Sequence, residues 1–258
     1  MLDRLLWAVV GWLPAAPWAD WLAVPVGDDR IGPGWPARRA TALGTTLRAD
    51  PDGGLLPEVS ALPGADRIHP RVLDFYAHTA RYALEVEPRW WPGLRIAGRI
   101  WARLFARRWG QLELPMAAGE PLSNEIFVSG APDPCRWWVR RYADGRTLYV
   151  SHYQIVDVDS EPEACVRIAF PVPGGAWVVL FRVACDGDAL VLTEAGGRAG
   201  GPGLYLVRAD GRAFYVRAFR EEIRVAPDGD GSRAVHRFWL FGLPFLSLGY
   251  VLSDRGTA

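Results

Sequence analysis

The second half of the chain alternates between short apolar segments and turn-forming residues. Between Glu125 and Leu252 about ten apolar segments are each ended by Gly, Pro or Asp. Short segments at regular spacing, with no helix-length stretch between them, are typical of antiparallel strands. The pattern therefore predicts one large antiparallel sheet, either open or closed into a barrel.

The connections between these segments support sequential hairpins. Asp-Gly pairs stand at residues 144–145, 186–187, 210–211 and 228–229. Asp and Gly tolerate the positive φ that tight turns require, so each pair can join two adjacent strands. We expect strands over residues 125–129, 135–142, 146–156, 164–170, 176–184, 188–194, 203–208, 213–225, 233–242 and 244–252.

Helical periodicity is confined to the first half of the chain. Apolar residues from Arg71 to Glu87 recur at spacings of three and four, which predicts an amphipathic helix beginning near Pro70. A second helix is expected over residues 92–108. Helices that precede strands as a block indicate an α+β protein. We expect N-terminal helices followed by a meander of about ten strands, as an open or closed β-barrel of lipocalin-like architecture.

The first residues are apolar enough to raise the question of a membrane anchor. The stretch from Leu5 to Val26 has the length of a membrane span, but prolines and Asp20 interrupt it. A short docked helix followed by an irregular strap is favoured, and an anchor stays the alternative. The expected organisation is a strap over 1–68, two helices over 69–118 and the barrel over 119–258, with 69–258 as one folding unit.

Composition argues against some partners. The formal net charge is zero, all 29 basic residues are Arg, and there are 13 Trp. Proteins that bind nucleic acids usually carry an excess or a stripe of basic residues, so we expect no nucleic-acid partner. The three cysteines lack metal-ligand spacing. We therefore expect no metal and no other cofactor, and a reduced cytoplasmic protein with buried thiols, with a single disulfide as the alternative.

The second expected helix carries a basic ridge. Arginines recur there at every fourth residue. Each spacing of four residues turns about 40° more than one full helical turn, so these arginines follow one side of the helix. The ridge consists of Arg95, Arg99, Arg103 and Arg107. A basic amphipathic helix of this kind can lie on an anionic membrane surface. The alternative is a solvated helix whose Arg stems cover apolar neighbours.

Charged residues also lie in the middle of the expected strand over 213–225. Alternation places Arg217 and Glu221 on one face and Arg220 and Glu222 on the other. If one face lines a barrel, its Arg and Glu must be paired, or must bind a ligand carboxylate or phosphate. These four residues are the candidate ligand-binding residues, and solvent-facing ion pairs are the alternative.

His236 is the candidate for acid–base chemistry. A hairpin between strands 213–225 and 233–242 would bring it close to Glu221 or Glu222. A His–carboxylate pair can transfer protons, although it is more often a structural hydrogen bond. No nucleophile elbow and no zinc-protease motif is found in the sequence. His236 and Glu222 are therefore named as candidates without an assigned catalytic role.

Three runs of sequence carry a resemblance. They are His69-Pro70 through Phe75-Tyr76 to Thr79, then Arg220-Glu221-Glu222-Ile223, then Gly242-Leu243-Pro244-Phe245-Leu246-Ser247-Leu248-Gly249-Tyr250. Together they resemble an uncharacterised group of bacterial proteins of unknown function, over residues 70–252. The resemblance implies relatedness and no particular activity.

These observations favour a non-enzymatic protein that binds a small hydrophobic or lipid-like ligand inside the barrel. One alternative is a protein peripheral to an anionic membrane, which would use the basic ridge and the Trp-rich start. The other is an enzyme with a His/Glu pair. The first hypothesis requires an interior cavity of roughly 300 Å³ or more.

Overall fold

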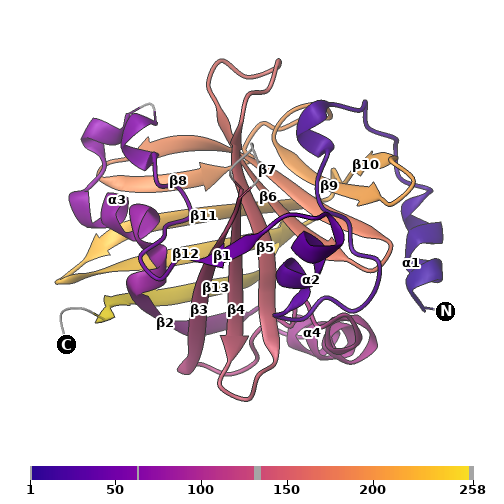
Figure 1. Ribbon diagram of the computed structural model, residues 1–258, viewed down its shortest axis with the longest axis horizontal. Helices are drawn as coiled ribbons and strands as arrows, with labels where there is room; N and C mark the ends of the chain where they lie inside the picture. The colour runs from indigo at the N-terminus through magenta and orange to yellow at the C-terminus, as the bar shows by residue number, and fades with distance from the viewer. Residues whose placement is uncertain (1, 63, 131–134, 256–258) are drawn as a thin grey trace.

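A ring of antiparallel strands forms the centre of the molecule, and helices lie on both sides of it (Figure 1). The computed structural model describes residues 2–62, 64–130 and 135–255. The α-helices are α1 (Leu2–Val10), α2 (Trp35–Ala42), α3 (Pro70–Ala77), α4 (Leu94–Trp101) and α5 (Arg107–Trp109). Short 3₁₀ helices are η1 (Asp20–Leu22), η2 (Val59–Ala61), η3 (Ala65–Arg67) and η4 (Thr79–Arg81), and η5 (Ala102–Ala106) is a π-helix.

The strands follow the expected boundaries closely over most of the chain. They are β1 (Leu47–Ala49), β2 (Tyr82–Trp90), β3 (Glu120–Ser129), β4 (Arg136–Tyr142), β5 (Thr147–Val156), β6 (Cys165–Val172), β7 (Gly175–Asp186), β8 (Ala189–Thr193), β9 (Gly203–Arg208), β10 (Ala213–Tyr215), β11 (Phe219–Asp228), β12 (Gly231–Leu240) and β13 (Leu243–Asp254).

The sheet closes through β8. Its strand order is β10-β9-β7-β6-β5-β4-β3-β2-β13-β12-β11-β8, and β8 pairs with β7 as well as with β11. This second pairing makes a closed 10-strand barrel. Residues 175–180 of β7 pair with β9, and residues 182–186 pair with β8. The predicted α+β fold with an antiparallel barrel is confirmed.

The outer face of the barrel is partly covered by the N-terminal segment. Trp21 and Leu22 of η1 pack on the outer side chains of β6, β7 and β9. Ile31 and Trp35 cover the outer face of β4 and β5 in the same way. Every residue of β6 is buried as a result, although a strand with one solvated face would alternate.

The helix predicted over residues 71–87 is wrong in its second half. It ends at Ala77, and after η4 the chain continues as β2. In β2 the buried Leu84 and Val86 flank the exposed Glu85, which is the two-residue period of a strand. Pairing with both β3 and β13 outweighs local helical preference here. The barrel therefore begins before residue 119.

The second predicted helix is present as the continuous segment α4–η5–α5. The predicted strand over 213–225 is divided into β10 and β11. The apolar start forms the short helix α1 and, further along, the 3₁₀ helix η1. Within the described residues, none of the helices combines the length and the apolar character needed to cross a bilayer.

Candidate functional site

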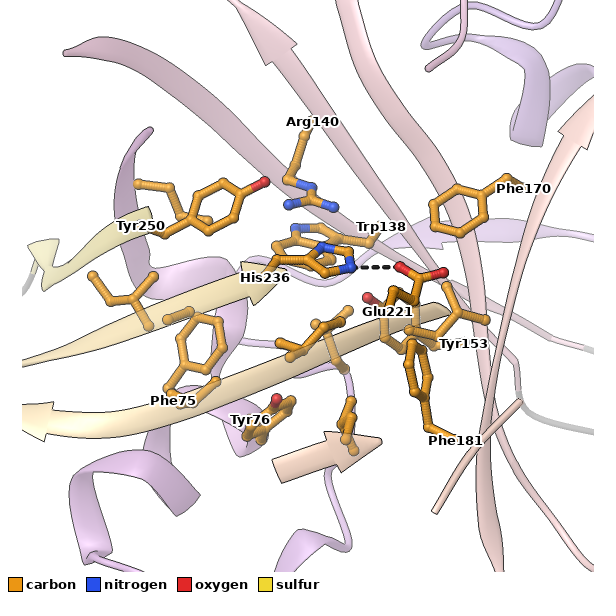
Figure 2. Close-up of a pocket in the computed structure, with 18 residues that line it drawn as sticks. Phe75, Tyr76, Trp138, Arg140, Tyr153, Phe170, Phe181, Glu221, His236 and Tyr250 are labelled. Carbon is orange, nitrogen blue, oxygen red and sulfur yellow. Dashed lines mark hydrogen bonds and ion pairs between the residues drawn. The ribbon is translucent and has the colours of Figure 1, made fainter. Parts of the chain in front are cut away.

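A small cavity inside the barrel is surrounded by aromatic rings and a few polar groups (Figure 2). Its volume is about 40 Å³. The aromatic residues that line it are Phe75, Tyr76, Trp138, Tyr153, Phe170, Phe181 and Tyr250. Phe75 and Tyr76 come from α3, so this helix closes one side of the cavity. Apart from the tyrosines, the titratable groups that line it are Arg140, Glu221 and His236.

The hairpin of β11 and β12 brings Glu221 and His236 together. In its register Glu221 lies opposite Phe238, and His236 lies opposite Ile223. Glu221 and His236 are therefore diagonal neighbours on the inward face. Nε2 of His236 and Oε2 of Glu221 share a hydrogen bond. The His236 ring also packs on Phe238, with ring centroids 3.9 Å apart.

Burial determines the protonation of this pair. It lowers the pKa of His236 well below its ordinary value, and the nearby Arg140 lowers it further. Burial also raises the pKa of Glu221 to about 8. At neutral pH the pair therefore holds one proton and has no net charge, because a low-dielectric site disfavours both ionised forms.

Glu194 is a second buried carboxyl group next to the pair. Its Oε1 accepts a hydrogen bond from the backbone N–H of Glu221. Burial, together with the carboxyl group of Glu221, raises the pKa of Glu194 to about 8. The junction of β8 and β11 thus holds two carboxyl groups that are mainly neutral at neutral pH.

Arg140 is a buried cation on the cavity wall. Its guanidinium carbon lies 3.8 Å from the ring centroid of Trp138 and 4.4 Å from that of Tyr149. Its Nε forms no hydrogen bond within the described residues, and no carboxylate among them forms an ion pair with it. The Tyr250 hydroxyl points toward Arg140 (Figure 2); burial raises the pKa of Tyr250, and the nearby Arg140 opposes this rise. The arrangement leaves a desolvated positive charge beside the cavity.

The structure separates the four residues predicted to bind a ligand. Only Glu221 lines the cavity. Arg217 and Arg220 are exposed, and the Arg220 guanidinium lies over the Trp239 ring on the outside. Glu222 points outward and pairs with Arg237 at 3.3 Å, so it is not the partner of His236. Glu222 thus forms a solvent-facing ion pair, which was the alternative to ligand binding.

Sequence reasoning missed Arg140, which the structure places at the centre of the site. The available signal was its position two residues after Trp138, which puts both side chains on one face of β4. The other histidine considered, His152, lies on the outer face of β5 against Trp137, with ring centroids 4.9 Å apart. Its burial lowers its pKa to about 3.

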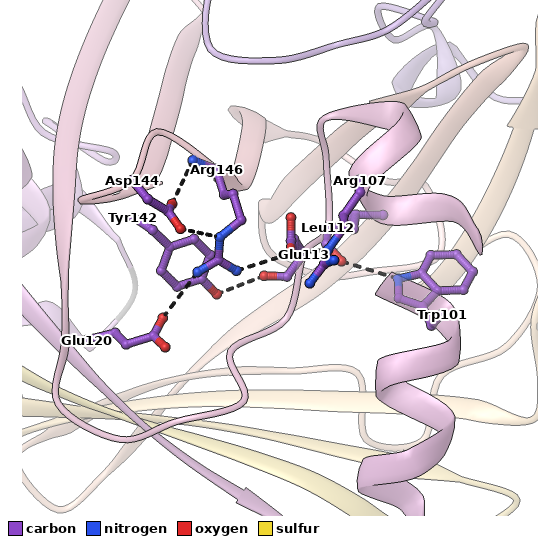
Figure 3. A network of polar contacts seen from close by, with 8 residues as sticks. All are labelled: Trp101, Arg107, Leu112, Glu113, Glu120, Tyr142, Asp144 and Arg146. Atoms are coloured by element: carbon purple, nitrogen blue, oxygen red, sulfur yellow. Dashed lines mark hydrogen bonds and ion pairs between the residues drawn. The ribbon is translucent and has the colours of Figure 1, made fainter. Parts of the chain in front are cut away.

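Two of the four arginines of the basic ridge bind other parts of the chain, and two are exposed to solvent. Arg95 donates to the carbonyl oxygen of Met116 at 2.6 Å. Arg107 donates to the buried Glu113 at 3.1 Å, and Glu113 also binds Arg146 of the β4–β5 hairpin (Figure 3). The two remaining arginines, Arg99 and Arg103, are exposed and form no ion pair within the described residues.

Comparison with known proteins gives one informative match. The chain is 25% identical over 211 residues to the Uncharacterized membrane protein YndJ of Bacillus subtilis (strain 168). The match covers 78% of this chain and 38% of that protein, so the chain spans well under half of the relative's length. No protein-family model and no solved structure matches. The match agrees with the resemblance to uncharacterised bacterial proteins over part of the chain.

Proposed function

We propose that the barrel interior binds a small molecule carrying an anionic group, and that Arg140 is the counter-ion. The observation that supports this is a buried guanidinium beside a cavity without an ion-pair partner among the described residues. A buried charge is costly unless it is paired, and stacking on two aromatic rings offsets only part of that cost. A carboxylate or phosphate would complete the pairing through two parallel hydrogen bonds.

The cavity volume limits the size of this ligand. Sites for drug-sized molecules measure roughly 300–1,000 Å³, whereas this cavity measures about 40 Å³. The expectation of a ready-made cavity for a lipid-like molecule is therefore wrong for the side-chain positions described. A ligand that leaves these positions unchanged has only a few non-hydrogen atoms. A longer apolar tail requires the lining rings to rotate.

Ligand-induced stabilisation tests the proposal. The full chain is heated with acetate, with inorganic phosphate, or with chloride at equal ionic strength. A ligand at about 100 times its dissociation constant stabilises the folded state by about 2.7 kcal/mol. We expect acetate or phosphate to raise the melting temperature of the wild type relative to chloride.

Variants of two arginines separate the interior from the surface. Arg140→Gln should lose the stabilisation by the anion, whatever its own melting temperature, because the comparison is made within each variant. Arg220→Gln is the matched control, since Arg220 stacks on a ring outside the barrel. The proposal fails if neither anion stabilises the wild type, or if both variants lose the effect equally.

A second candidate function is acid–base catalysis, which is favoured by the hydrogen bond between His236 and Glu221 on the cavity wall. A neutral imidazole beside a carboxyl group of raised pKa can accept a proton and return it. Nitrogen NMR of His236 tests this role. We expect a neutral ring at pH about 7, and an imidazolium signal would exclude His236 as a base.

A further inference from the structure

Large apolar side chains are exposed on α4 and η5 and at the tip of the β12–β13 hairpin. On α4 and η5, Ile96, Ile100 and Leu104 are exposed and follow one another at four-residue spacing. The backbone N–H of Trp91, just before this helix, donates to the carbonyl oxygen of Phe245 at 3.0 Å. The helix therefore starts beside the β12–β13 hairpin. We call the following exposed residues the apolar face: Trp91, Ile96, Ile100, Leu104, Leu240, Phe241 and Leu243.

The hairpin tip holds Phe241 in a backbone conformation that disfavours it. Leu240 pairs with Leu243, and the two residues between them, Phe241 and Gly242, have φ of 52° and 79°. Turns with two positive φ values strongly prefer Asn-Gly, and a bulky residue there is strained. The Phe241 side chain is 79% exposed, so packing does not offset this strain. Strain at an exposed aromatic residue points to binding.

On the helical part of the apolar face, all neighbouring charged residues are basic. Arg99 and Arg103 lie next to the ridge of Ile96 and Ile100, and both are exposed. Residues 88–112 contain no acidic residue. A row of cations beside an exposed apolar ridge is complementary to anionic lipid headgroups above acyl chains.

The hairpin tip is also bordered by arginines. The backbone N–H of Phe241 donates to the carbonyl oxygen of Ala218 at 2.6 Å. This bond places the tip beside the segment that carries Arg217 and Arg220, which are both exposed. Arg217, one residue before Ala218, can therefore contact headgroups when the tip enters the apolar layer.

We propose that the apolar face docks on an anionic membrane. Phe241 and the Ile96–Ile100 ridge enter the apolar layer, while Arg99, Arg103 and Arg217 contact the headgroups. This surface is separate from the cavity in the barrel, and the proposal does not depend on ligand binding there.

Charge complementarity favours a membrane over a second copy of the chain. A two-fold contact would bring the same patch of both copies together. The helix would then set Arg99 and Arg103 against arginines, with no acidic residue from 88–112 to pair with them. Like charges across an interface are costly, whereas an anionic membrane supplies the opposite charge.

A substitution at the hairpin tip separates membrane binding from folding. Phe241→Asn creates the Asn-Gly pair that this turn prefers, so we expect the resistance to urea to be kept or increased. We also expect about a tenfold weaker binding to vesicles, because the buried aromatic ring is lost. Binding is measured by co-sedimentation of the full chain with vesicles of phosphatidylcholine and phosphatidylglycerol. Leu43→Asn, at an exposed leucine after α2, is the matched control and should bind as the wild type.

The arginines are tested with a charge-matched pair of double variants. Arg99→Gln with Arg103→Gln should weaken binding to the same vesicles by about thirtyfold, and high salt should weaken wild-type binding. Arg48→Gln with Arg198→Gln removes two exposed arginines elsewhere and should have little effect.

Three results would overturn the proposal. The first is a wild type that does not bind vesicles containing phosphatidylglycerol at low salt. The second is equal binding by Phe241→Asn and the wild type, or an equal loss in the control variants. The third is a dimer of the wild type that Phe241→Asn dissociates without a change in vesicle binding, which would make the apolar face a contact between two copies.

Discussion

Replacing Glu194 by Gln isolates the energetic cost of one buried carboxyl group. The residue is 5% exposed, and the amide oxygen of Gln can still accept the backbone N–H of Glu221. Burial and the neighbouring carboxyl group raise the pKa of Glu194 from 4.5 to about 8. A raised pKa means that the folded state holds the proton more tightly. The stabilisation is therefore complete below the ordinary pKa and is lost as the pH rises through the folded pKa.

The pKa values also set the size of the effect. At about 1.4 kcal/mol for each pKa unit, a rise from 4.5 to about 8 corresponds to about 5 kcal/mol. We expect Glu194→Gln to change the free energy of unfolding by less than about 1 kcal/mol near pH 5, and to increase it by roughly 3–5 kcal/mol above pH 8.

Urea unfolding across this pH range measures the difference directly. Glu222→Gln is the control, because Glu222 is on the outer face of the same strand and pairs with Arg237. It should show no comparable gain at alkaline pH. The reasoning is refuted if Glu194→Gln increases the free energy of unfolding equally at every pH, or does not increase it at alkaline pH.

Three further substitutions probe packing and charge. Gly54→Ala should destabilise the fold by about 3 kcal/mol in urea unfolding, because a Cβ there would overlap the backbone of Tyr76 and Ala77. His152→Leu should flatten the acid limb of the stability curve: the pKa of the buried His152 is lowered to about 3, so the wild type loses up to about 5 kcal/mol between pH 6.5 and 3. Glu113→Gln should cost about 1–2 kcal/mol at neutral pH, less in high salt, because its two arginine partners are partly exposed.

The strands were predictable because their signals are local. Apolar segments and Asp-Gly turns determine a hairpin without reference to distant residues, and β4 to β9 lie within a few residues of the expected boundaries. The segment β2 was mistaken for helix because its partners, β3 and β13, come later in the chain. A strand between distant partners has no turn of its own to identify it.

Only the part of the site that belongs to a single hairpin, the Glu221–His236 pair, could be predicted from the sequence. The alternation of β11 and the register of β12 place Glu221 and His236 on the same face, so their proximity follows from adjacent sequence. The position of Arg140 depends on closure of the ring, which brings β4 across from β12. Closure requires β8 to pair on both of its edges, and no local pattern encodes this.

The short strand β8 also marks one place where the ring can part. This strand has 5 residues, whereas β7 has 12 and β11 has 10. The two seams of β8 pair 4 residues with β11 and 5 with β7, and among the barrel junctions of the described residues only β2–β3, with 3, pairs fewer. Local opening costs least at short junctions of this kind. Backbone amides along β8 should exchange with solvent earlier than those of β5 or β6. A molecule entering the interior would then pass beside Glu194, which lies directly after this strand.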